Sequence, residues 1–200
     1  MSLIIQTTKM KFHKTRILQI IVIVLIVLPY LGTLYIYQWY KNEADKIENA
    51  HFILVSKQEM RLFVYNYKGE ELHKFPIACG LNYGNKNEQG DMKTPEGIFR
   101  ISEILNTTDW SHDFNDGKGK ISGAYGPHFI RLYVPGHRGI GIHGTHEPDS
   151  MEKRVTEGCI RLRNEDLLNL IPMIHNGTIV IITASTEDMN VINNLNENET

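Results

Sequence analysis

The sequence predicts a mostly β domain, built as a β-sandwich or barrel, that follows a single N-terminal transmembrane helix. Three observations predict this arrangement: 21 consecutive uncharged residues near the N-terminus, many short β-rich runs bounded by Gly, Pro, Asn or Asp, and one short helical pattern between two of these runs. We expect five segments along the 200 residues. They are a cytoplasmic basic leader (1–16), a transmembrane helix (17–37), a stalk (38–50), a folded domain (51–184) and a flexible tail (185–200).

Residues 17–37 have the length and composition of a membrane-spanning helix. At a rise of 1.5 Å per residue, such a segment forms a helix of roughly 30 Å, the thickness of a bilayer core. The leader before it has four basic residues and no acidic one, which favours a cytoplasmic N-terminus and a folded domain outside the membrane. A cleaved signal peptide is the alternative, but the bulky aromatic residues between Tyr35 and Tyr40 leave no small-residue cleavage site.

The charge and the cysteine content argue against two classes of protein. Beyond the leader the chain has 17 Lys and Arg against 23 Asp and Glu, a formal charge of −6, and nucleic-acid binding needs a basic surface. Two cysteines are too few for a disulfide scaffold, and a domain of about 140 residues buries its own core without one. Each cysteine therefore needs a separate explanation.

The folded domain is expected to begin with an antiparallel meander. Residues 51–79 contain three β-rich runs separated by the turn-like sequences SKQE and YKGE. Further strands are predicted in the runs GIFRIS, HFIRLYV, GIGIH, CIRL and TIVIITA. Between the last two runs, a short helix is expected to begin with Asn164 as its N-cap and to end near residues 175–177, with Pro172 shortening or kinking it.

Two long glycine-rich loops interrupt the strands, at residues 79–99 and 105–129. Loops of this length in a compact domain are usually functional or disordered. The second loop contains Trp110 and Tyr125 among its glycines, which favours a functional role as a lid or as a wall of the substrate site.

Residues 139–167 combine two histidines, four glycines and a cysteine, so three kinds of site are possible. A zinc site would use His143, His146 and Cys159, but residues three apart on a strand point to opposite faces. A disulfide would join Cys159 to Cys79, but Cys79 ends an apolar strand, where a buried inert thiol is the ordinary outcome. The third possibility is a thiol nucleophile.

The surroundings of Cys159 favour the nucleophile. Gly158 lets the backbone come close to whatever the sulfur touches. Arg161 would project to the same face of a strand as the sulfur, where its charge could lower the thiol pKa or hold a substrate carboxylate. His143 is the candidate base, and the N–H groups of Gly158 and Cys159 are candidate oxyanion donors.

These residues resemble the active-site motif of the L,D-transpeptidase family, the YkuD domain. The sequence IHGTHEP followed by TEGCIRLRNED is similar to the family's histidine-glycine pair and its Ser/Thr-His-Gly-Cys run, with an arginine two positions after the cysteine. The upstream sequences GDMKTPEGIFRI and YGPHFIRL are similar to further family segments, and the resemblance covers residues 52–183. It implies a mostly β fold and a cysteine acyltransferase that acts on peptidoglycan stem peptides.

The resemblance also implies a role for each matching position. Cys159 becomes the nucleophile that forms a thioester with the stem peptide and expels D-alanine, and His143 becomes its base. Gly158 becomes part of the oxyanion region, and Arg161 becomes the cation that orients the substrate or stabilises the thiolate. The expected substrate-binding residues are Tyr125, His146, Gly144 and Thr145. No metal and no organic cofactor is implied.

One position departs from the family motif. Glu157 stands where the family most often has a histidine before Gly-Cys. Its negative charge would raise the thiol pKa, which Arg161 would have to offset, or its side chain would turn away and bind Arg154 or Arg163.

The predicted protein is thus a single-pass membrane protein whose extracytoplasmic domain passes stem peptides to an amine acceptor and does not bind nucleic acid. An L,D-carboxypeptidase, which gives the acyl group to water, is the nearest alternative. A catalytically silent protein that binds the cell wall or zinc is the third reading, with Glu157 as the sign of lost activity.

Overall fold

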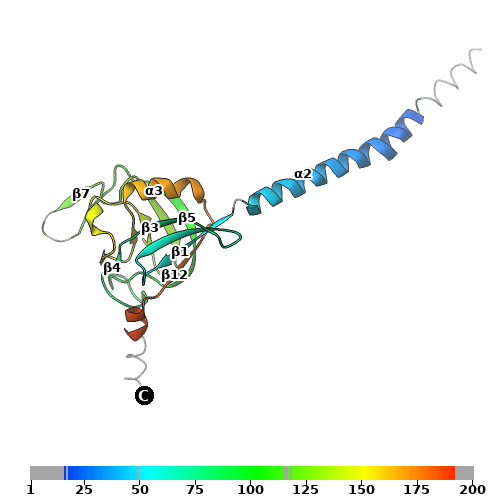
Figure 1. Ribbon diagram of the computed structural model, residues 1–200. Coiled ribbons are helices and arrows are strands. Elements are labelled where there is room, and N and C mark those ends of the chain that lie inside the picture. Colours follow the sequence, from blue (N-terminus) through cyan, green and yellow to red (C-terminus); the bar gives the residue numbers. More distant parts are fainter. Residues whose placement is uncertain (1–15, 17, 49, 115–116, 118, 192–200) are drawn as a thin grey trace, which may run out of the picture. The chain divides into compact units, whose positions relative to one another are not determined.

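The computed structural model describes residues 16, 18–48, 50–114, 117 and 119–191, which divide between two units, one ending at Glu48 and one beginning at Asn49 (Figure 1). The first unit contains a π-helical turn η1 (Ile23–Val27) followed directly by α2 (Leu28–Glu48). The π turn lies just before Pro29, which has no N–H to donate, and the N–H of Leu28 bonds to the carbonyl of Ile23.

Leu18–Lys46 form the one helix in the described part of the chain that is long and apolar enough to cross a membrane. Its 29 residues extend past the predicted boundary at residue 37, because the stalk continues the helix. A helix satisfies its backbone hydrogen bonds internally, as a membrane-spanning segment must. Apart from Arg16, the predicted basic leader lies outside the described residues, as do residues 192–200 of the predicted tail.

The second unit is built around one eight-stranded sheet with the order β11-β9-β8-β5-β12-β1-β2-β3. The named strands are β1 (His51–Ser56), β2 (Arg61–Asn66), β3 (Glu71–Pro76), β4 (Cys79–Gly80), β5 (Gly97–Asn106), β6 (Ser111–Asp113), β7 (Lys120–Ser122), β8 (His128–Tyr133), β9 (Gly141–His143), β10 (Arg154–Thr156), β11 (Ile160–Arg161) and β12 (Ile179–Thr183). β1, β2 and β3 form the predicted antiparallel meander. Each further run predicted as a strand contains one, and the mostly β fold is confirmed.

The sheet brings distant segments of the chain together. β12 lies between β1 and β5, parallel to β1 and antiparallel to β5, so a late strand forms the centre of the sheet. Side chains that point inward alternate along the strands, as with Ile53 and Val55 on β1 and with Val180 and Ile182 on β12. The curled sheet thereby encloses a single apolar core.

α3 (Asn164–Leu170) lies over the sheet and inserts Leu167 and Leu170 into the core (Figure 1). The helix ends earlier than residues 175–177, because Pro172 lies in the 3-10 turn η3 (Ile171–Met173) that follows. Pro172 therefore shortens the helix, one of the two effects expected of it.

The prediction that Asn164 is the N-cap of this helix is wrong. Arg163 occupies the cap position, and it makes no side-chain cap hydrogen bond. The side-chain oxygen of Asn164 instead accepts the N–H of Thr145 at 2.8 Å. Asn164 thus joins α3 to the segment that follows β9.

Two pairs of short strands lie outside the large sheet. β4 pairs with β10 in parallel, and β6 pairs with β7 in an antiparallel hairpin. The hairpin lies within residues 105–129, which were predicted to be a loop. Its strands have three residues each and no clear apolar alternation, so the sequence pattern does not reveal them.

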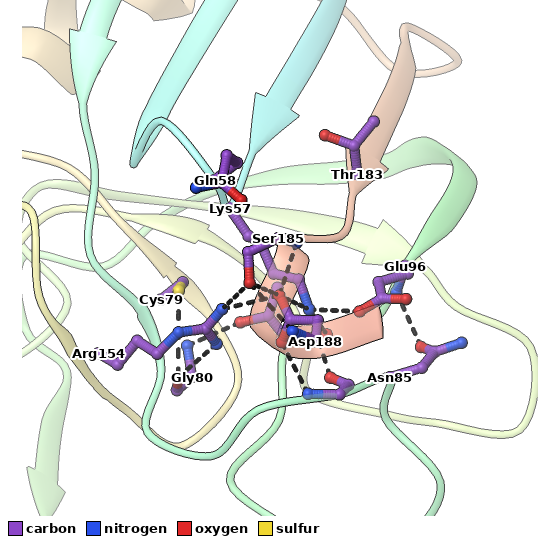
Figure 2. Close-up of polar contacts among 12 residues, drawn as sticks. Lys57, Gln58, Cys79, Gly80, Asn85, Glu96, Arg154, Thr183, Ser185 and Asp188 are labelled. Atoms are coloured by element: carbon purple, nitrogen blue, oxygen red, sulfur yellow. Dashed lines mark hydrogen bonds and ion pairs between the residues drawn. The ribbon is translucent and has the colours of Figure 1, made fainter. Parts of the chain in front are cut away.

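A buried cluster of charges joins the C-terminal end of the domain to its centre (Figure 2). The ammonium group of Lys57, directly after β1, lies 2.6 Å from a carboxylate oxygen of Glu96 and 3.2 Å from one of Asp188. The same oxygen of Asp188 lies 2.7 Å from the guanidinium of Arg154. The side chains of Lys57 and Asp188 are fully buried, so each charge depends on its partners for compensation.

Asp188 belongs to a helical turn at residues 186–191, and its carboxylate accepts the N–H groups of Ser185 and Gly84. Burial by itself would raise the pKa of Asp188, but these hydrogen bonds and the charge of Lys57 lower it to about 2. Residues 185–191, at the start of the predicted flexible tail, thus include a helical turn whose Asp188 is bonded to the domain. The cluster also fixes Gly84, at the start of a segment that reaches the candidate site.

Candidate active site

A cavity of about 650 Å³ opens where the ends of β9 and β11 meet two loops. One wall is formed by residues 86–90 and Met92, and another by residues 136–140. His112 and Tyr125 contribute side chains from the hairpin region. Cys159, His143 and Arg161 line the same cavity.

The parallel pairing of β9 and β11 brings the thiol and the imidazole to this cavity. In the register of the two strands, Ile160 pairs with Ile142 and Arg161 pairs with His143. Alternate residues of a strand share a face, so Cys159 and Arg161 face the cavity while Ile160 is fully buried in the core. The pairing of β9 with β11 therefore brings Cys159 and His143 to the same cavity, as the sequence motif predicts.

The ring of His143 is buried and held by three contacts. It stacks on Phe129 with ring centroids 5.6 Å apart and meets the ring of Tyr125 edge-on at 5.0 Å. Its Nδ1 lies 2.6 Å from the carbonyl of Gly144, which can only accept, so Nδ1 carries the proton and Nε2 is the basic nitrogen. Burial lowers the pKa of His143 to about 4, and the ring is therefore neutral at pH 7.

The thiol of Cys159 is half-buried and donates to the carbonyl of Gly139 at 3.3 Å, rather than to His143. Burial raises the pKa of Cys159 to about 11. The charge of Glu157 adds to this increase, whereas the N–H of Gly141 and the charge of Lys86 oppose it. The resting site therefore holds a neutral thiol and a neutral imidazole rather than a thiolate-imidazolium pair.

The conformation of Gly158 requires glycine. Its φ is +126°, and a Cβ there would lie 2.6 Å from the carbonyl oxygen of Lys93. Its N–H, predicted as an oxyanion donor, donates to Oγ1 of Thr156 at 3.2 Å, and that hydroxyl donates to the carbonyl of Cys159 at 2.6 Å. Gly158 thus permits a close approach of the backbone at Lys93. Because the N–H of Gly158 already has a partner, the N–H of Cys159 is the remaining candidate oxyanion donor.

Arg161 is buried, and its guanidinium already has protein partners. Nη1 donates to the hydroxyl of Ser150 at 2.9 Å and lies 3.2 Å from a carboxylate oxygen of Glu147. Although burial dominates the pKa of Cys159, the charge of Arg161 lowers it. This geometry fits a fixed positive charge near the thiol better than a mobile group that grips the substrate.

Glu157 binds an imidazole rather than an arginine. Its Oε2 lies 3.2 Å from Nε2 of His112, and Nδ1 of the same ring lies 2.9 Å from the hydroxyl of Tyr125. Arg154, one of the two arginines expected to bind Glu157, pairs with Asp188 instead. Of the two effects considered for Glu157, the increase in the thiol pKa is present, and the pairing with Arg154 is wrong.

Of the four predicted substrate-binding residues, Tyr125 alone lines the cavity. Gly144 and Thr145 lie against the start of α3, where the N–H of Thr145 donates to the Asn164 side chain and a Cβ on Gly144 would collide with the same oxygen. His146 packs on the ring of Phe114 beside the cavity. Gly144, Thr145 and His146 therefore support the walls of the site rather than forming its surface.

Both cysteines of the chain are free thiols. Cys79 is buried, its sulfur lies 3.8 Å from that of Met60, and burial raises its pKa. This is the environment expected for an inert thiol, and no disulfide joins it to Cys159. Within the described residues, no group of three His, Cys, Asp or Glu side chains is arranged to hold a metal ion.

Sequence reasoning does not single out His112 or Lys86, although both line the cavity. Lys86 pairs with Asp91 at 2.7 Å, and three backbone N–H groups of the same loop also donate to the Asp91 carboxylate. Burial would raise the pKa of Asp91, but these bonds hold it well below its usual range. The available signal was the length and glycine content of the two loops, which marks the segments but not the side chains.

The curled sheet and its cavity define a mostly β domain with a thiol and an imidazole at the ends of adjacent strands. The profile of the L,D-transpeptidase catalytic domain, YkuD, matches residues 50–182. The chain belongs to this family.

Two relatives show how the similarity is distributed along the chain. YkuD of Bacillus licheniformis, named as an L,D-transpeptidase, is 43% identical over 61 residues, which cover 30% of this chain and 35% of the relative. ErfK/SrfK of Escherichia coli K12, likewise named as an L,D-transpeptidase, is 28% identical over 148 residues, which cover 65% of this chain and 43% of the relative. The chain thus matches less than half the length of either protein.

The fold is also found among solved structures. An L,D-transpeptidase from Mycobacterium smegmatis superposes with a TM-score of 0.52 at 20% sequence identity, covering 67% of this chain and 58% of that one. At this identity the likeness concerns the fold, which agrees with the fold class predicted from the sequence.

Proposed function

We propose that this chain is a membrane-anchored L,D-transpeptidase that acts on peptidoglycan stem peptides outside the cytoplasmic membrane. Cys159 is its nucleophile, and the acyl group passes through a thioester to an amine acceptor. The observation that carries the proposal is the pairing of β9 with β11, which sets Cys159 and His143 at one cavity within a domain of this family.

In the first half-reaction, Nε2 of His143 takes the thiol proton while Sγ of Cys159 attacks the carbonyl carbon of the third stem residue. An S–C bond forms, the C–N bond to the terminal D-alanine breaks, and the imidazolium gives its proton to the leaving amine. The neutral resting state supports this order, since a thiol with a pKa of about 11 needs a base at pH 7. The hydrogen bond from Nδ1 to Gly144 leaves Nε2 to serve as that base.

Nearby groups stabilise the negative charge that develops along this path. The N–H of Cys159 is the proposed donor to the oxyanion that forms on a carbonyl attached to its own sulfur. Lys86 and Arg161 line the cavity, and their charges lower the pKa of Cys159 against the dominant effect of burial. Both cations are paired with acids, Asp91 and Glu147, so they act as fixed charges.

The proposed anchor is the apolar segment at residues 17–37, with residues 1–16 in the cytoplasm and the domain at 51–184 outside. The long apolar helix Leu18–Lys46 supports this topology, as does the basic leader before it. Mass spectrometry of the protein purified from membranes tests it: an intact N-terminus and retention in the membrane fraction after a salt wash are expected. A mature chain that begins beyond residue 37 would identify a cleaved signal peptide instead.

Product analysis tests the reaction and separates its alternatives. The full-length chain in detergent micelles is incubated with a disaccharide-tetrapeptide, and the products are identified by mass spectrometry. Loss of alanine together with a cross-linked dimer is the expected result. Tripeptide without dimer would identify an L,D-carboxypeptidase, and the absence of any product would identify a catalytically silent protein.

A further inference from the structure

The side chains of Tyr125, His112 and Glu157 form a hydrogen-bonded chain along one wall of the cavity. The Tyr125 hydroxyl lies 2.9 Å from Nδ1 of His112, and Nε2 of that ring lies 3.2 Å from Oε2 of Glu157. All three residues line the cavity that contains Cys159. They come from separate segments: Tyr125 lies in the loop before β8, His112 on β6 and Glu157 in the turn before β11.

The Glu157 carboxylate selects one tautomer of the neutral His112 ring. An ionised carboxylate only accepts, so Nε2 of His112 must donate to Glu157. In the neutral ring Nδ1 is then the acceptor, and the hydroxyl of Tyr125 donates to it. Burial, together with the charges of Cys159 and Glu157, raises the pKa of Tyr125 to about 12, which keeps this hydroxyl protonated. Its oxygen retains a lone pair that can accept a hydrogen bond.

The imidazole of this chain is held in place by aromatic rings. The ring of Phe114 meets that of His112 edge-on, with centroids 4.5 Å apart, and the ring of Tyr125 meets it at 5.5 Å. The side chains of His112 and Glu157 are 26% and 45% exposed, so the chain runs from the cavity to solvent. A fixed imidazole between a hydroxyl and a carboxylate is the arrangement that a proton relay requires.

The wall formed by Tyr125, His112 and Glu157 carries a negative charge, whereas Lys86 and Arg161 are cations elsewhere in the cavity lining. Lys86 and Arg161 are compensated by carboxylates at 2.7 Å and 3.2 Å, whereas the carboxylate of Glu157 is paired with an imidazole. This wall therefore favours a group that donates protons or carries positive charge. His143, which is buried beneath Tyr125 with ring centroids 5.0 Å apart, already serves the thiol in the first half-reaction.

We propose that Tyr125, His112 and Glu157 form an acceptor-side relay that binds the amine of the acyl acceptor and takes its proton. The inference rests on the proposed function and specifies its second half-reaction. Tyr125 touches the acceptor and is the catalytic residue, while His112 and Glu157 are positioning residues that act through it.

The relay accounts for each proton and each bond in the transfer step. The neutral acceptor amine attacks the thioester carbonyl, and as the C–N bond forms one N–H proton passes to the Tyr125 oxygen. The proton of the hydroxyl moves to Nδ1 of His112, and Glu157 stabilises the resulting imidazolium. The C–S bond then breaks with its electron pair left on Sγ of Cys159, and the relay returns the proton to that sulfur. The products are a new amide and the free thiol.

The test separates acylation from transfer in the full-length protein in detergent micelles. The variants are His112→Gln, Tyr125→Phe and Glu157→Gln, and the control is His175→Gln, an exposed histidine outside the cavity wall. With a disaccharide-tetrapeptide as donor and acceptor, rapid quenching measures the first equivalent of D-alanine, and intact mass measures the acyl-enzyme. The steady rate of dimer formation measures transfer.

We expect His112→Gln and Tyr125→Phe to release the first equivalent of D-alanine at nearly the wild-type rate, to accumulate the acyl-enzyme and to form dimer about 100-fold more slowly. Glu157→Gln should show a smaller loss in the same step, and His175→Gln should behave as wild type. Equal loss of acylation and transfer, or unchanged dimer formation, would overturn the relay and leave the function of Cys159 intact. A wild-type protein that forms no acyl-enzyme would overturn the proposed function itself.

Discussion

Nδ1 of His143 lies 2.6 Å from the carbonyl oxygen of Gly144, so the ring presents Nε2 as its basic nitrogen. The contact fixes the tautomer that a general base needs, and it does so with a backbone group that no side-chain substitution removes. The buried ring is neutral over most of the pH range, because burial lowers its pKa to about 4.

The first prediction concerns pH. Protonated His143 cannot take the thiol proton, so kcat/KM for D-alanine release should fall as pH decreases through about 4 and should be flat from about pH 5 to 9. Stopped assays across this range measure the profile. The variant His146→Gln, which alters an imidazole outside the cavity, should leave it unchanged. A decrease centred near the ordinary imidazole pKa of about 6.5 would contradict a neutral buried base.

The second prediction concerns the reactivity of the thiol. The charge of Glu157 adds to the effect of burial on the pKa of Cys159, so Glu157→Gln should lower that pKa and speed alkylation by iodoacetamide at pH 8. Peptide mapping follows Cys159 separately from the buried Cys79. Glu88→Gln, which removes another acid from the cavity wall, is the control and should have a smaller effect. Equal alkylation in wild type and Glu157→Gln would show that Glu157 does not control the thiol.

The third prediction concerns Gly158. Replacing it with alanine places a Cβ against the carbonyl of Lys93 at a positive φ, and the free energy of unfolding should decrease by about 3 kcal/mol. Gly69→Ala is the matched control, because Gly69 also has a positive φ but open space around it, and its cost should be about 1 kcal/mol. Urea unfolding followed by fluorescence measures both. Equal costs would mean that the contact with Lys93 contributes nothing.

The fourth prediction concerns the buried cluster. Asp188→Asn removes the acid shared by Lys57 and Arg154 and leaves a buried ammonium with less compensation. The protein should lose about 3 to 5 kcal/mol of stability, as measured by urea unfolding at pH 7. Glu187→Gln, at an exposed position of the same helical turn, should change stability by less than about 0.5 kcal/mol. A stable Asp188→Asn protein would show that the cluster does not hold the C-terminal turn.

The sequence was sufficient for the elements whose signal is local. Strands such as β1 and β5 follow from β-branched residues between turn residues. The presence of Cys159 and His143 at one cavity follows from a specific sequence motif that contains both residues. Arg161 shares the cavity with the sulfur because alternate strand residues share a face.

Long-range contacts account for what the sequence could not reveal. Nothing in TIVIITA indicates that β12 lies between β1 and β5, and the polar segment after residue 184 resembles a tail until Asp188 meets Lys57. Asn164 is a residue type that favours N-cap positions, yet its side-chain oxygen accepts a tertiary hydrogen bond from the N–H of Thr145. His112 is one polar residue in a long loop, and only the hairpin brings it to Glu157.

The most direct test of the central claim is the intact mass of the full-length protein, in detergent micelles, after brief incubation with a disaccharide-tetrapeptide. We predict an adduct equal to the substrate minus D-alanine, located on Cys159 by peptide mapping and absent from Cys159→Ala, while Cys79→Ala still forms it. An adduct on another residue, or the same D-alanine release from Cys159→Ala as from wild type, would contradict the account.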